Sequence, residues 1–355
     1  MNFTQAEALL RQGIAEGLMP GAAYAVGQGE RVFAQGIFGN RQTLPESLPL
    51  EEDTLFDLAS LSKLVGTTMA ALRSIESGRL LLSDPISRWF PDMPADKSGI
   101  TLRHLLTHTS GIPAHLPLWQ MGIRPEEYPS AILSAPLRNP PGRETEYSCM
   151  GFLLLGRILE LVWEQPLDEL VSTLVFVPLG MASACYCPDS LNCAATEYRD
   201  PAHPELGILC GEVHDENARF VGGAAGNAGI FCRFSDMVRF ASMLSGRGKG
   251  FLSERMFRLA VQNATPGCLE SRGLGFQLFT GADCPCGDLF SPGSFGHTGF
   301  TGTSLYVDEE TGVYILLLTN RVHPSRENGG EFFRMRRAFQ NAVWGGLSLE
   351  EGGRA

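Results

Sequence analysis

The stretch Phe56-Asp57-Leu58-Ala59-Ser60-Leu61-Ser62-Lys63 contains a serine that is followed three residues later by a lysine. Apolar residues then recur at helical spacing from Leu64 to Leu81. If Ser60 opens that helix, Lys63 lies one turn further along and on the same side. A serine hydroxyl becomes a good nucleophile when a nearby base removes its proton, and a lysine with a lowered pKa can be that base. The stretch therefore predicts a Ser–Lys pair at the start of a helix.

A serine that caps a helix, with a lysine in the first turn, produces the same pattern. The use of basic residues elsewhere favours chemistry over capping. Only three of the 28 basic residues are lysines, namely Lys63, Lys97 and Lys249. Arginine stays protonated in proteins, whereas the pKa of lysine can be shifted into the range where it accepts a proton. A lysine here, in a chain that otherwise uses arginine, indicates a reactive role.

The composition is that of a folded protein. The chain has 355 residues, of which 44% are hydrophobic and 19% charged, and this length suits about two lobes. The net charge is −11 and no lysine-rich run occurs, so we do not expect a nucleic-acid partner. The first residues lack a basic segment followed by an apolar run, and the most apolar stretch, 150–162, is short and charged at Arg157 and Glu160. We expect a cytoplasmic protein without a membrane segment, either a monomer or a homodimer.

The cysteines do not predict a disulfide framework, because their number is odd and the chain is long. Neither Cys-x-Cys pair has the spacing of a zinc knuckle, and His104 and His108 stand four residues apart without an obvious third ligand. We expect reduced thiols and neither a metal nor another cofactor. The nine cysteines are Cys149, Cys185, Cys187, Cys193, Cys210, Cys232, Cys268, Cys284 and Cys286.

The order of helical and extended patterns predicts an α+β fold. We expect an antiparallel sheet flanked by N- and C-terminal helices, with a mostly helical domain (60–269) inserted between the two parts of the sheet domain (1–59 and 270–355). The active site would lie in the cleft between the two domains. The patterns behind this prediction are helices over 4–16, 101–107, 150–162, 167–174, 234–244 and 331–344, and strands over 22–27, 31–38, 274–280, 302–307 and 313–319.

Two later stretches offer partners for the Ser–Lys pair. Tyr147 comes just before the helix predicted over 150–162, where a helix N-terminus and a nearby lysine would favour the phenolate and allow proton transfer. His297 follows Gly296 at the start of a strand, where it could orient or protonate a substrate group. A backbone N–H just after Gly299 could face an oxyanion, because the glycines allow close approach.

The motifs Ser60-Leu61-Ser62-Lys63, Tyr147-Ser148-Cys149 and His297-Thr298-Gly299 occur in an order and at separations that resemble the serine β-lactamase and penicillin-binding-protein-like family. The branch that they resemble most contains class C β-lactamases, D-Ala-D-Ala carboxypeptidases, D-aminopeptidases and family VIII esterases. The resemblance runs from about residue 10 to about residue 345 and includes the stretch from Leu102 to Gly111.

This resemblance implies roles for individual residues. Ser60 would be the acylated nucleophile, Lys63 its base, and Tyr147 the group that relays protons to the leaving group and later to water. The backbone N–H groups of Ser60 and Phe300 would form the oxyanion hole. The residues implied in substrate binding are Cys149, His297, Thr298 and Gly299.

One residue departs from the family pattern. The second motif usually ends in asparagine, which hydrogen-bonds the acyl amide of β-lactam or peptide substrates, and Cys149 stands there instead. A thiol is a weak donor and a weak acceptor. This substitution favours ester or other acyl substrates over amides.

We therefore expect a serine hydrolase that acts through an acyl-enzyme on a small-molecule ester, or on a small amide or peptide. The alternative within the family is a β-lactamase or a D-Ala-D-Ala carboxypeptidase. The alternative of another class is a non-catalytic binding protein that retains the fold.

Overall fold

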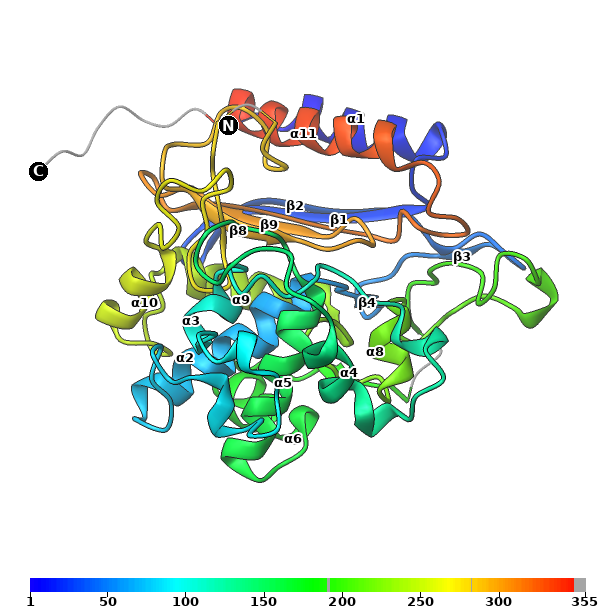
Figure 1. Cartoon of the computed structure of the whole chain (residues 1–355). Coiled ribbons are helices and arrows are strands. Elements are labelled where there is room, and N and C mark those ends of the chain that lie inside the picture. Colours follow the sequence, from blue (N-terminus) through cyan, green and yellow to red (C-terminus); the bar gives the residue numbers. More distant parts are fainter. Residues whose placement is uncertain (190–191, 282, 348–355) are drawn as a thin grey trace, which may run out of the picture.

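The computed structural model describes residues 1–189, 192–281 and 283–347. A seven-stranded antiparallel sheet separates two layers of helices (Figure 1). The terminal helices α1 (Thr4–Ala15) and α11 (Gly329–Gly346) cover one face, and helices from the middle of the chain lie on the other. The predicted α+β class, with an antiparallel sheet flanked by the two terminal helices, is confirmed.

The two ends of the chain meet at the centre of the sheet. β1 (Gly21–Gln28) pairs with β10 (Val313–Thr319), with Ala22 opposite Thr319. The division into a sheet domain (1–59 and 270–355) and a helical domain (60–269) stays a prediction. Residues 348–355, at the end of the predicted sheet domain, lie outside the described residues. The strand order is β3-β2-β1-β10-β9-β8-β7, and the other strands are β2 (Arg31–Gln42), β3 (Leu48–Pro49), β7 (Gln277–Leu278), β8 (Phe295–Thr298) and β9 (Ser304–Val307).

Side chains of the two central strands alternate between two hydrophobic cores. Tyr24 of β1 and Ile315 of β10 face the terminal helices, where Tyr24 meets Phe339 of α11 with ring centroids 5.6 Å apart. Ala25 and Leu316, one residue further along each strand, belong to the core that the helical layer shares. Because both faces are buried, the central strands lack the polar alternation of a solvent-facing sheet.

The helical layer also holds a small second sheet with the order β4-β6-β5. Its strand β4 (Leu55–Asp57) ends just before Ser60 and pairs with β6 (Ile230–Arg233), which follows a glycine-rich segment. β5 is Cys185–Tyr186, and the helices of this layer are α2 (Met69–Glu76), α3 (Leu102–Leu106), α4 (Tyr128–Ser134), α5 (Cys149–Trp163), α6 (Leu167–Val171), α7 (Val177–Leu179), α8 (Glu216–Phe220), α9 (Phe234–Ser245) and α10 (Glu254–Val261).

Several predicted elements are shorter or less regular than expected, among them the helix after Ser60 and the strand over 274–280. The helix after Ser60 is a π-helix over Lys63–Thr68 followed by α2, and it ends at Glu76 instead of Leu81 because Gly78 adopts a left-handed conformation (φ +75°). The strand predicted over 274–280 pairs only at β7. Gly275, with φ +77°, turns the chain just before it.

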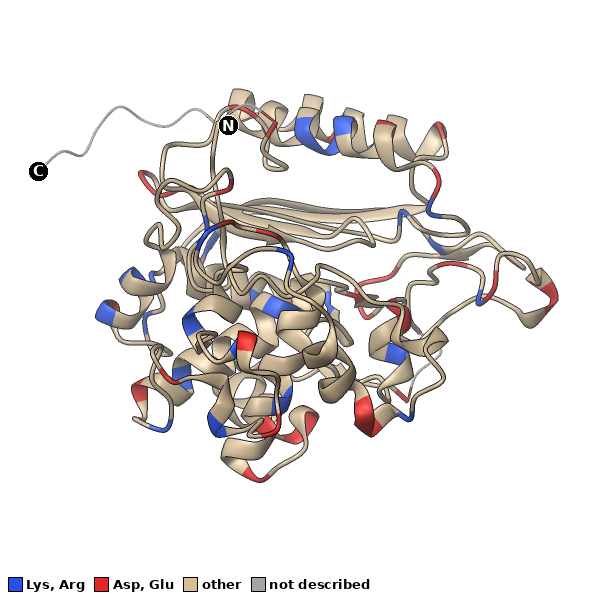
Figure 2. Cartoon of the chain, viewed as in Figure 1, with Lys and Arg blue, Asp and Glu red and all other residues tan. Residues whose placement is uncertain are grey.

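Figure 2 shows acidic and basic residues interspersed over the helices and loops of both layers. In the described part of the chain, no helix combines the length and the apolar character needed to cross a bilayer.

Candidate active site

Ser60 lies on a sharp turn that leaves β4. Ala59 has φ +46°, which is uncommon for a residue with a side chain. The carboxylate of Asp57 supports this turn, because it accepts hydrogen bonds from the backbone N–H of Ala59 (2.8 Å) and of His214 (2.7 Å). Asp57 therefore connects the serine turn to the loop before α8.

Lys63 is completely buried beneath Ser60. Its Nζ donates to Oγ of Ser60 at 3.0 Å, to the carbonyl oxygen of Asn227 at 2.8 Å, and to Sγ of Cys149 at 3.4 Å. Three acceptors match the three N–H groups of an ammonium. The arrangement brings the predicted Ser–Lys pair together and suits a lysine that carries a proton in the resting state.

The pKa values of Lys63 and Tyr147 shift in the opposite directions to those expected from the sequence. Burial by itself lowers the pKa of Lys63, but Cys149 and Tyr147 beside it raise that pKa by more, and the net direction is upward. Burial raises the pKa of Tyr147 by more than the nearby Lys63 lowers it. The expectations of a lysine with a lowered pKa and of a favoured phenolate were therefore wrong for the resting site.

Tyr147 comes immediately before α5, whose N-cap is Ser148. Its ring centroid lies 5.1 Å from Nζ of Lys63 and 4.7 Å from the ring of His108. The backbone N–H of Ser148 donates to Nδ1 of His108 at 3.0 Å, so this buried histidine holds the tyrosine segment in place. The Tyr147 hydroxyl is buried beside the side chains of Lys63 and Ser60, both of which act to lower its pKa, although it makes no hydrogen bond of regular geometry among the described residues.

His297 lies on β8 and is buried beside Tyr147, with ring centroids 5.9 Å apart. A carbonyl only accepts, so Nδ1–H donates to the carbonyl oxygen of Thr298 (2.7 Å) and Nε2 carries the lone pair. Burial, followed by the charges of Arg272 and Lys63, lowers the pKa of His297 to about 3. His297 is thus a neutral acceptor that can orient a substrate, but it is a poor proton donor at neutral pH.

This low pKa predicts a pH-dependent stability. Between pH 6.5 and pH 3 the unfolded chain binds a proton that His297 in the folded chain does not, so stability falls as the pH is lowered. We expect the free energy of unfolding to drop between pH 6.5 and pH 5 by about 2 kcal/mol more in the wild type than in His297→Gln. Urea unfolding at both pH values measures this difference. The exposed His203→Gln variant is the control, and an equal drop in wild type and His297→Gln would contradict the assignment.

The turn between β8 and β9 carries the second predicted oxyanion donor. Neither the backbone N–H of Ser60 nor that of Phe300 donates to another described residue. Hydroxyls anchor this turn to the chain before Ser60, because Thr301 donates to the carbonyl of Asp57 (2.8 Å) and Thr303 to that of Leu58 (3.0 Å). These bonds hold the turn against the chain before Ser60, and Ser60 and Phe300 line the same cavity.

The close approach at this turn depends on glycine. A Cβ on Gly299 would collide with the carbonyl oxygen of Leu58 and with the hydroxyl of Thr303. The glycine of the His-Thr-Gly motif therefore permits contact between the serine turn and the sheet.

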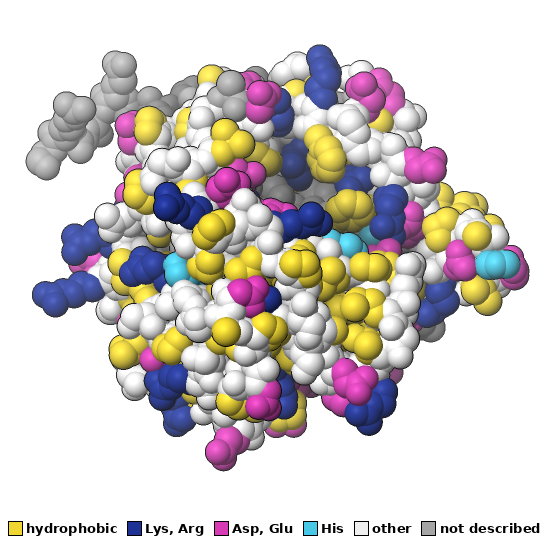
Figure 3. All heavy atoms as spheres, viewed as in Figure 1, with side chains coloured by type: hydrophobic (Ala, Val, Ile, Leu, Met, Phe, Trp, Pro, Cys, Tyr) yellow, Lys and Arg dark blue, Asp and Glu magenta, His cyan; other side chains and the backbone are white. Residues whose placement is uncertain are grey.

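A cavity of about 530 Å³ opens onto the predicted site, a size that suits a small organic ligand. Ser60, Tyr147 and the segment from His297 to Phe300 line it, while Lys63 and Cys149 are not among its lining residues. Three arginines line the same cavity. Arg272 pairs with Glu270, and Arg337 pairs with Asp283 and Asp288. Figure 3 shows basic and histidine side chains gathered where the helical layer meets the sheet.

Arg336 differs from the other two arginines of this cavity. It is 4% exposed and makes no ion pair with any residue in the described ranges, and its buried Nε has no hydrogen-bond partner there. Its guanidinium lies 5.2 Å from the ring centroid of Phe333, a residue that also lines the cavity. Burial lowers the pKa of Arg336. A buried guanidinium without a carboxylate partner is suited to a substrate anion.

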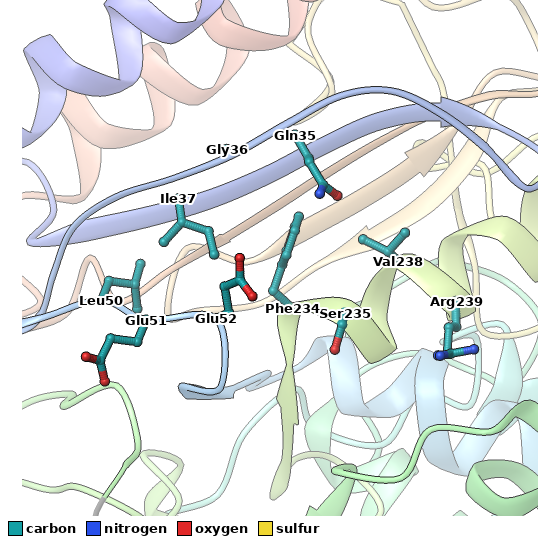
Figure 4. Close-up of a pocket in the computed structure, with 10 residues that line it drawn as sticks. All are labelled: Gln35, Gly36, Ile37, Leu50, Glu51, Glu52, Phe234, Ser235, Val238 and Arg239. Atoms are coloured by element: carbon teal, nitrogen blue, oxygen red, sulfur yellow. The ribbon is translucent and has the colours of Figure 1, made fainter.

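A larger cavity, of about 840 Å³, lies between β2 and α9 (Figure 4). Gln35 and Ile37 come from the strand, Phe234 and Val238 from the helix, and Glu52 from the segment before β4. None of the predicted site residues lines it. Its size therefore does not make it the better candidate for catalysis.

Some residues around Lys63 were not predicted individually. Asn227 supplies a carbonyl to Lys63, and its side-chain amide donates to the carboxylate of Asp215 at 3.0 Å. Asp215 also caps α8 by accepting from the N–H of Ala218. The sequence features that include these two residues are an Asp in the segment before α8 and the glycine-rich stretch 222–229. Neither feature predicts a contact with Lys63.

Comparison with known proteins identifies the family. The family model described as Beta-lactamase matches residues 6–339. The chain belongs to the Beta-lactamase family. It is also 30% identical over 309 residues to proteins of Salmonella enteritidis and Salmonella typhimurium that are each named "Putative D-alanyl-D-alanine carboxypeptidase", with 76% of this chain and 70% of each relative covered. The predicted resemblance is confirmed, and it makes this Beta-lactamase family member a serine hydrolase in general terms.

Solved structures show the same fold. EstCE1, described as "a hydrolase with promiscuous acyltransferase activity", is 24% identical with a TM-score of 0.77, and the match covers 96% of this chain and 97% of that chain. Simvastatin synthase (LovD) from Aspergillus terreus is 22% identical, again with a TM-score of 0.77, over 98% of both chains. A penicillin-binding protein homologue from Pyrococcus abyssi is 20% identical with a TM-score of 0.75, over 97% of this Beta-lactamase family member and 78% of that chain.

Proposed function

We propose that this protein hydrolyses small acyl esters through an acyl-enzyme on Ser60. The observation that supports this most directly is the 3.0 Å contact between Oγ of Ser60 and Nζ of Lys63, at the base of a cavity with two free backbone N–H groups. The same site suits small amides or peptides in principle. Membership of the Beta-lactamase family supports acyl chemistry at this site.

The proposed reaction uses three side chains. Oγ of Ser60 attacks the substrate carbonyl carbon while its proton passes to the amine form of Lys63, and the N–H groups of Ser60 and Phe300 stabilise the oxyanion. The Tyr147 hydroxyl then protonates the leaving oxygen, and the Lys63 ammonium returns a proton to the phenolate. Water attacks the acyl-enzyme by the reverse route, which frees the acid and restores Ser60.

Cys149 favours esters over amides. Its sulfur contacts Nζ of Lys63 at 3.4 Å, in the position where the family usually has an asparagine side chain. A thiol is a poor hydrogen-bond partner for an acyl amide. The structural similarity to EstCE1, which is described as a hydrolase with acyltransferase activity, is compatible with this choice.

One observation favours the second candidate, a D-Ala-D-Ala carboxypeptidase or β-lactamase. Substrates of both classes carry a carboxylate, and Arg336 offers the cavity an unpaired guanidinium. The Salmonella relatives bear the carboxypeptidase name. Under this alternative, Arg336 would hold the substrate carboxylate.

A substrate panel tests the proposal. Purified protein is assayed with p-nitrophenyl esters, D-amino-acid anilides and nitrocefin, and is labelled with a fluorophosphonate read by intact mass. We expect the highest kcat/KM with short acyl esters. A preference for nitrocefin, which carries a carboxylate, would favour the second candidate, and a preference for anilides would show that small amides are the substrates. The absence of both turnover and label, under conditions that label a related enzyme, would leave a non-catalytic binding protein that retains the fold.

The variant Cys149→Asn tests the account of substrate choice. Asparagine supplies an amide donor and acceptor at this position, so we expect kcat/KM for nitrocefin to rise about tenfold while that for the best ester changes little. Cys268→Asn is the matched control, because the sulfur of Cys268 contacts the carbonyl oxygen of Arg143, whereas that of Cys149 contacts Lys63. An unchanged nitrocefin rate in folded Cys149→Asn protein would contradict the explanation.

A further inference from the structure

The two Cys-x-Cys pairs differ in how their sulfurs are placed. Cys284 and Cys286 are 2% and 0% exposed, and their Sγ atoms lie 3.0 Å apart. A disulfide needs about 2.05 Å between sulfurs, so closing the bond requires a movement of about 1 Å. Within the described ranges, Cys185 and Cys187 make no such contact, and the sulfur of Cys187 faces the carbonyl of Gly222 instead.

The surroundings distinguish the two thiols of the 284/286 pair. The hydrogen bond from Cys286 is the main cause that lowers the pKa of Cys284 to about 7, with smaller contributions from backbone N–H groups and from Arg336. The same hydrogen bond and burial raise the pKa of Cys286. The pKa of Cys284 is thus lowered and that of Cys286 is raised, which makes Cys284 the more readily ionised thiol of the pair. A thiolate with an adjacent second thiol is the arrangement in which a peroxide produces a disulfide.

We propose that Cys284 and Cys286 form a reversible oxidation site whose oxidant is a small hydroperoxide such as hydrogen peroxide. The Cys284 thiolate attacks one peroxide oxygen, the O–O bond breaks, and hydroxide leaves to become water, which yields a sulfenic acid. The Cys286 thiol then attacks that sulfur and a second water leaves. Two thiols and one hydrogen peroxide thus give one disulfide and two waters. The burial of both sulfurs favours a small oxidant over a bulky disulfide donor.

The position of Pro285 connects this site to the cavity over Ser60. Pro285 lies between the two cysteines and lines that cavity together with Asp283. The loop is fastened to α11, because Asp288 accepts from Asn341 at 2.8 Å and from Arg337 at 3.0 Å. With this anchor held, pulling the sulfurs together displaces Pro285 relative to the cavity. The disulfide itself does not depend on the proposed function, but its effect on ester hydrolysis does.

Peptide mapping tests the proposal on the native full-length protein. The protein is treated with hydrogen peroxide, denatured, alkylated without reductant and digested with trypsin. The peptide Gly273–Arg321 contains no cysteine besides Cys284 and Cys286, so a disulfide within it removes two hydrogens from its mass and blocks alkylation. We expect this form to accumulate first and to disappear after treatment with dithiothreitol.

The second Cys-x-Cys pair is the internal control. Cys185 and Cys187 lie in a different tryptic peptide, 158–199, and we expect them to stay alkylatable at the same peroxide dose. Equal oxidation of both pairs, conversion of Cys284 to a sulfinic acid without a disulfide, or no oxidation of the 284/286 pair would each overturn the proposal. None of these outcomes depends on enzymatic activity or on the folding of a variant.

Activity gives a separate measurement. We expect oxidation to lower kcat/KM for the best ester about tenfold. Dithiothreitol is expected to restore the original kcat/KM, and the tenfold loss is expected to be absent in Cys286→Ser. If the disulfide forms and the protein hydrolyses none of the panel substrates, the proposed function fails and the oxidation site stands. If hydrolysis is present and unaffected by the disulfide, the link through Pro285 is wrong.

Discussion

Ser60→Ala is expected to lower kcat/KM for the best ester by at least about 10⁴-fold and to abolish fluorophosphonate labelling. The expected loss is large because Oγ of Ser60 is the only atom proposed to bond to the acyl group. The cavity and the N–H groups would remain, so substrate binding is expected to persist. Intact mass after labelling, together with steady-state kinetics, measures both effects.

Ser62→Ala is the matched control for this experiment. Ser62 follows Ser60 by two residues and is buried. Its Oγ accepts a hydrogen bond from the backbone N–H of Ile230 at 3.1 Å. Its loss is expected to cost about 1 kcal/mol of stability while labelling persists. Labelling that survives in Ser60→Ala and disappears in Cys149→Ala would move the nucleophile to the thiol and contradict the proposed mechanism.

Lys63→Arg is expected to lower kcat/KM by about 10³-fold even though it keeps the positive charge. Arginine cannot give up its proton in a protein, so it cannot accept the proton of Ser60. General-base catalysis typically contributes about 10²- to 10⁴-fold. The matched control is Lys97→Arg, since Lys97 is also buried, at 2% exposure, but pairs with Asp96 at 2.9 Å away from the cavity. Thermal unfolding of both variants shows whether the larger arginine is accommodated.

The pH profile tests the same residue in the wild-type protein. Because the pKa of Lys63 is raised, the amine form is the minor species at neutral pH, and its population grows with pH. We expect kcat/KM to rise about tenfold per pH unit through the neutral range, until the pKa of the group is reached. A profile that is flat between pH 6 and pH 9 would show that Lys63 is not a cation that must lose a proton.

Much of the fold was predictable because periodicity reflects burial. The helix predicted over 4–16 is α1 (Thr4–Ala15), and the strand predicted over 313–319 is β10 with the same bounds. The small sheet of β4, β5 and β6 was not predicted, since its strands are only two to four residues long and pair with partners far away in sequence. Short strands carry too few residues to show a period.

The site residues could be predicted where a motif carries them, and not where only a backbone atom takes part. Ser60, Lys63, Tyr147 and His297 belong to such motifs, and the structure gathers them around one cavity or directly beneath it. The carbonyl of Asn227 that accepts from Lys63 has no signature, because every residue has a carbonyl.

The sequence by itself determined the family, the α+β class and the residue types available for acyl transfer, since these follow from ordered motifs and from the periodicity of apolar residues. Only the tertiary structure decided the directions of the pKa shifts of Lys63 and His297, which depend on burial and on charges brought close from distant segments. It also decided that the sulfurs of Cys284 and Cys286 meet while those of Cys185 and Cys187 do not, although both pairs have the same spacing. The Ser-x-x-Lys stretch names the groups that we propose to react, and the surrounding fold sets the directions in which their pKa values shift.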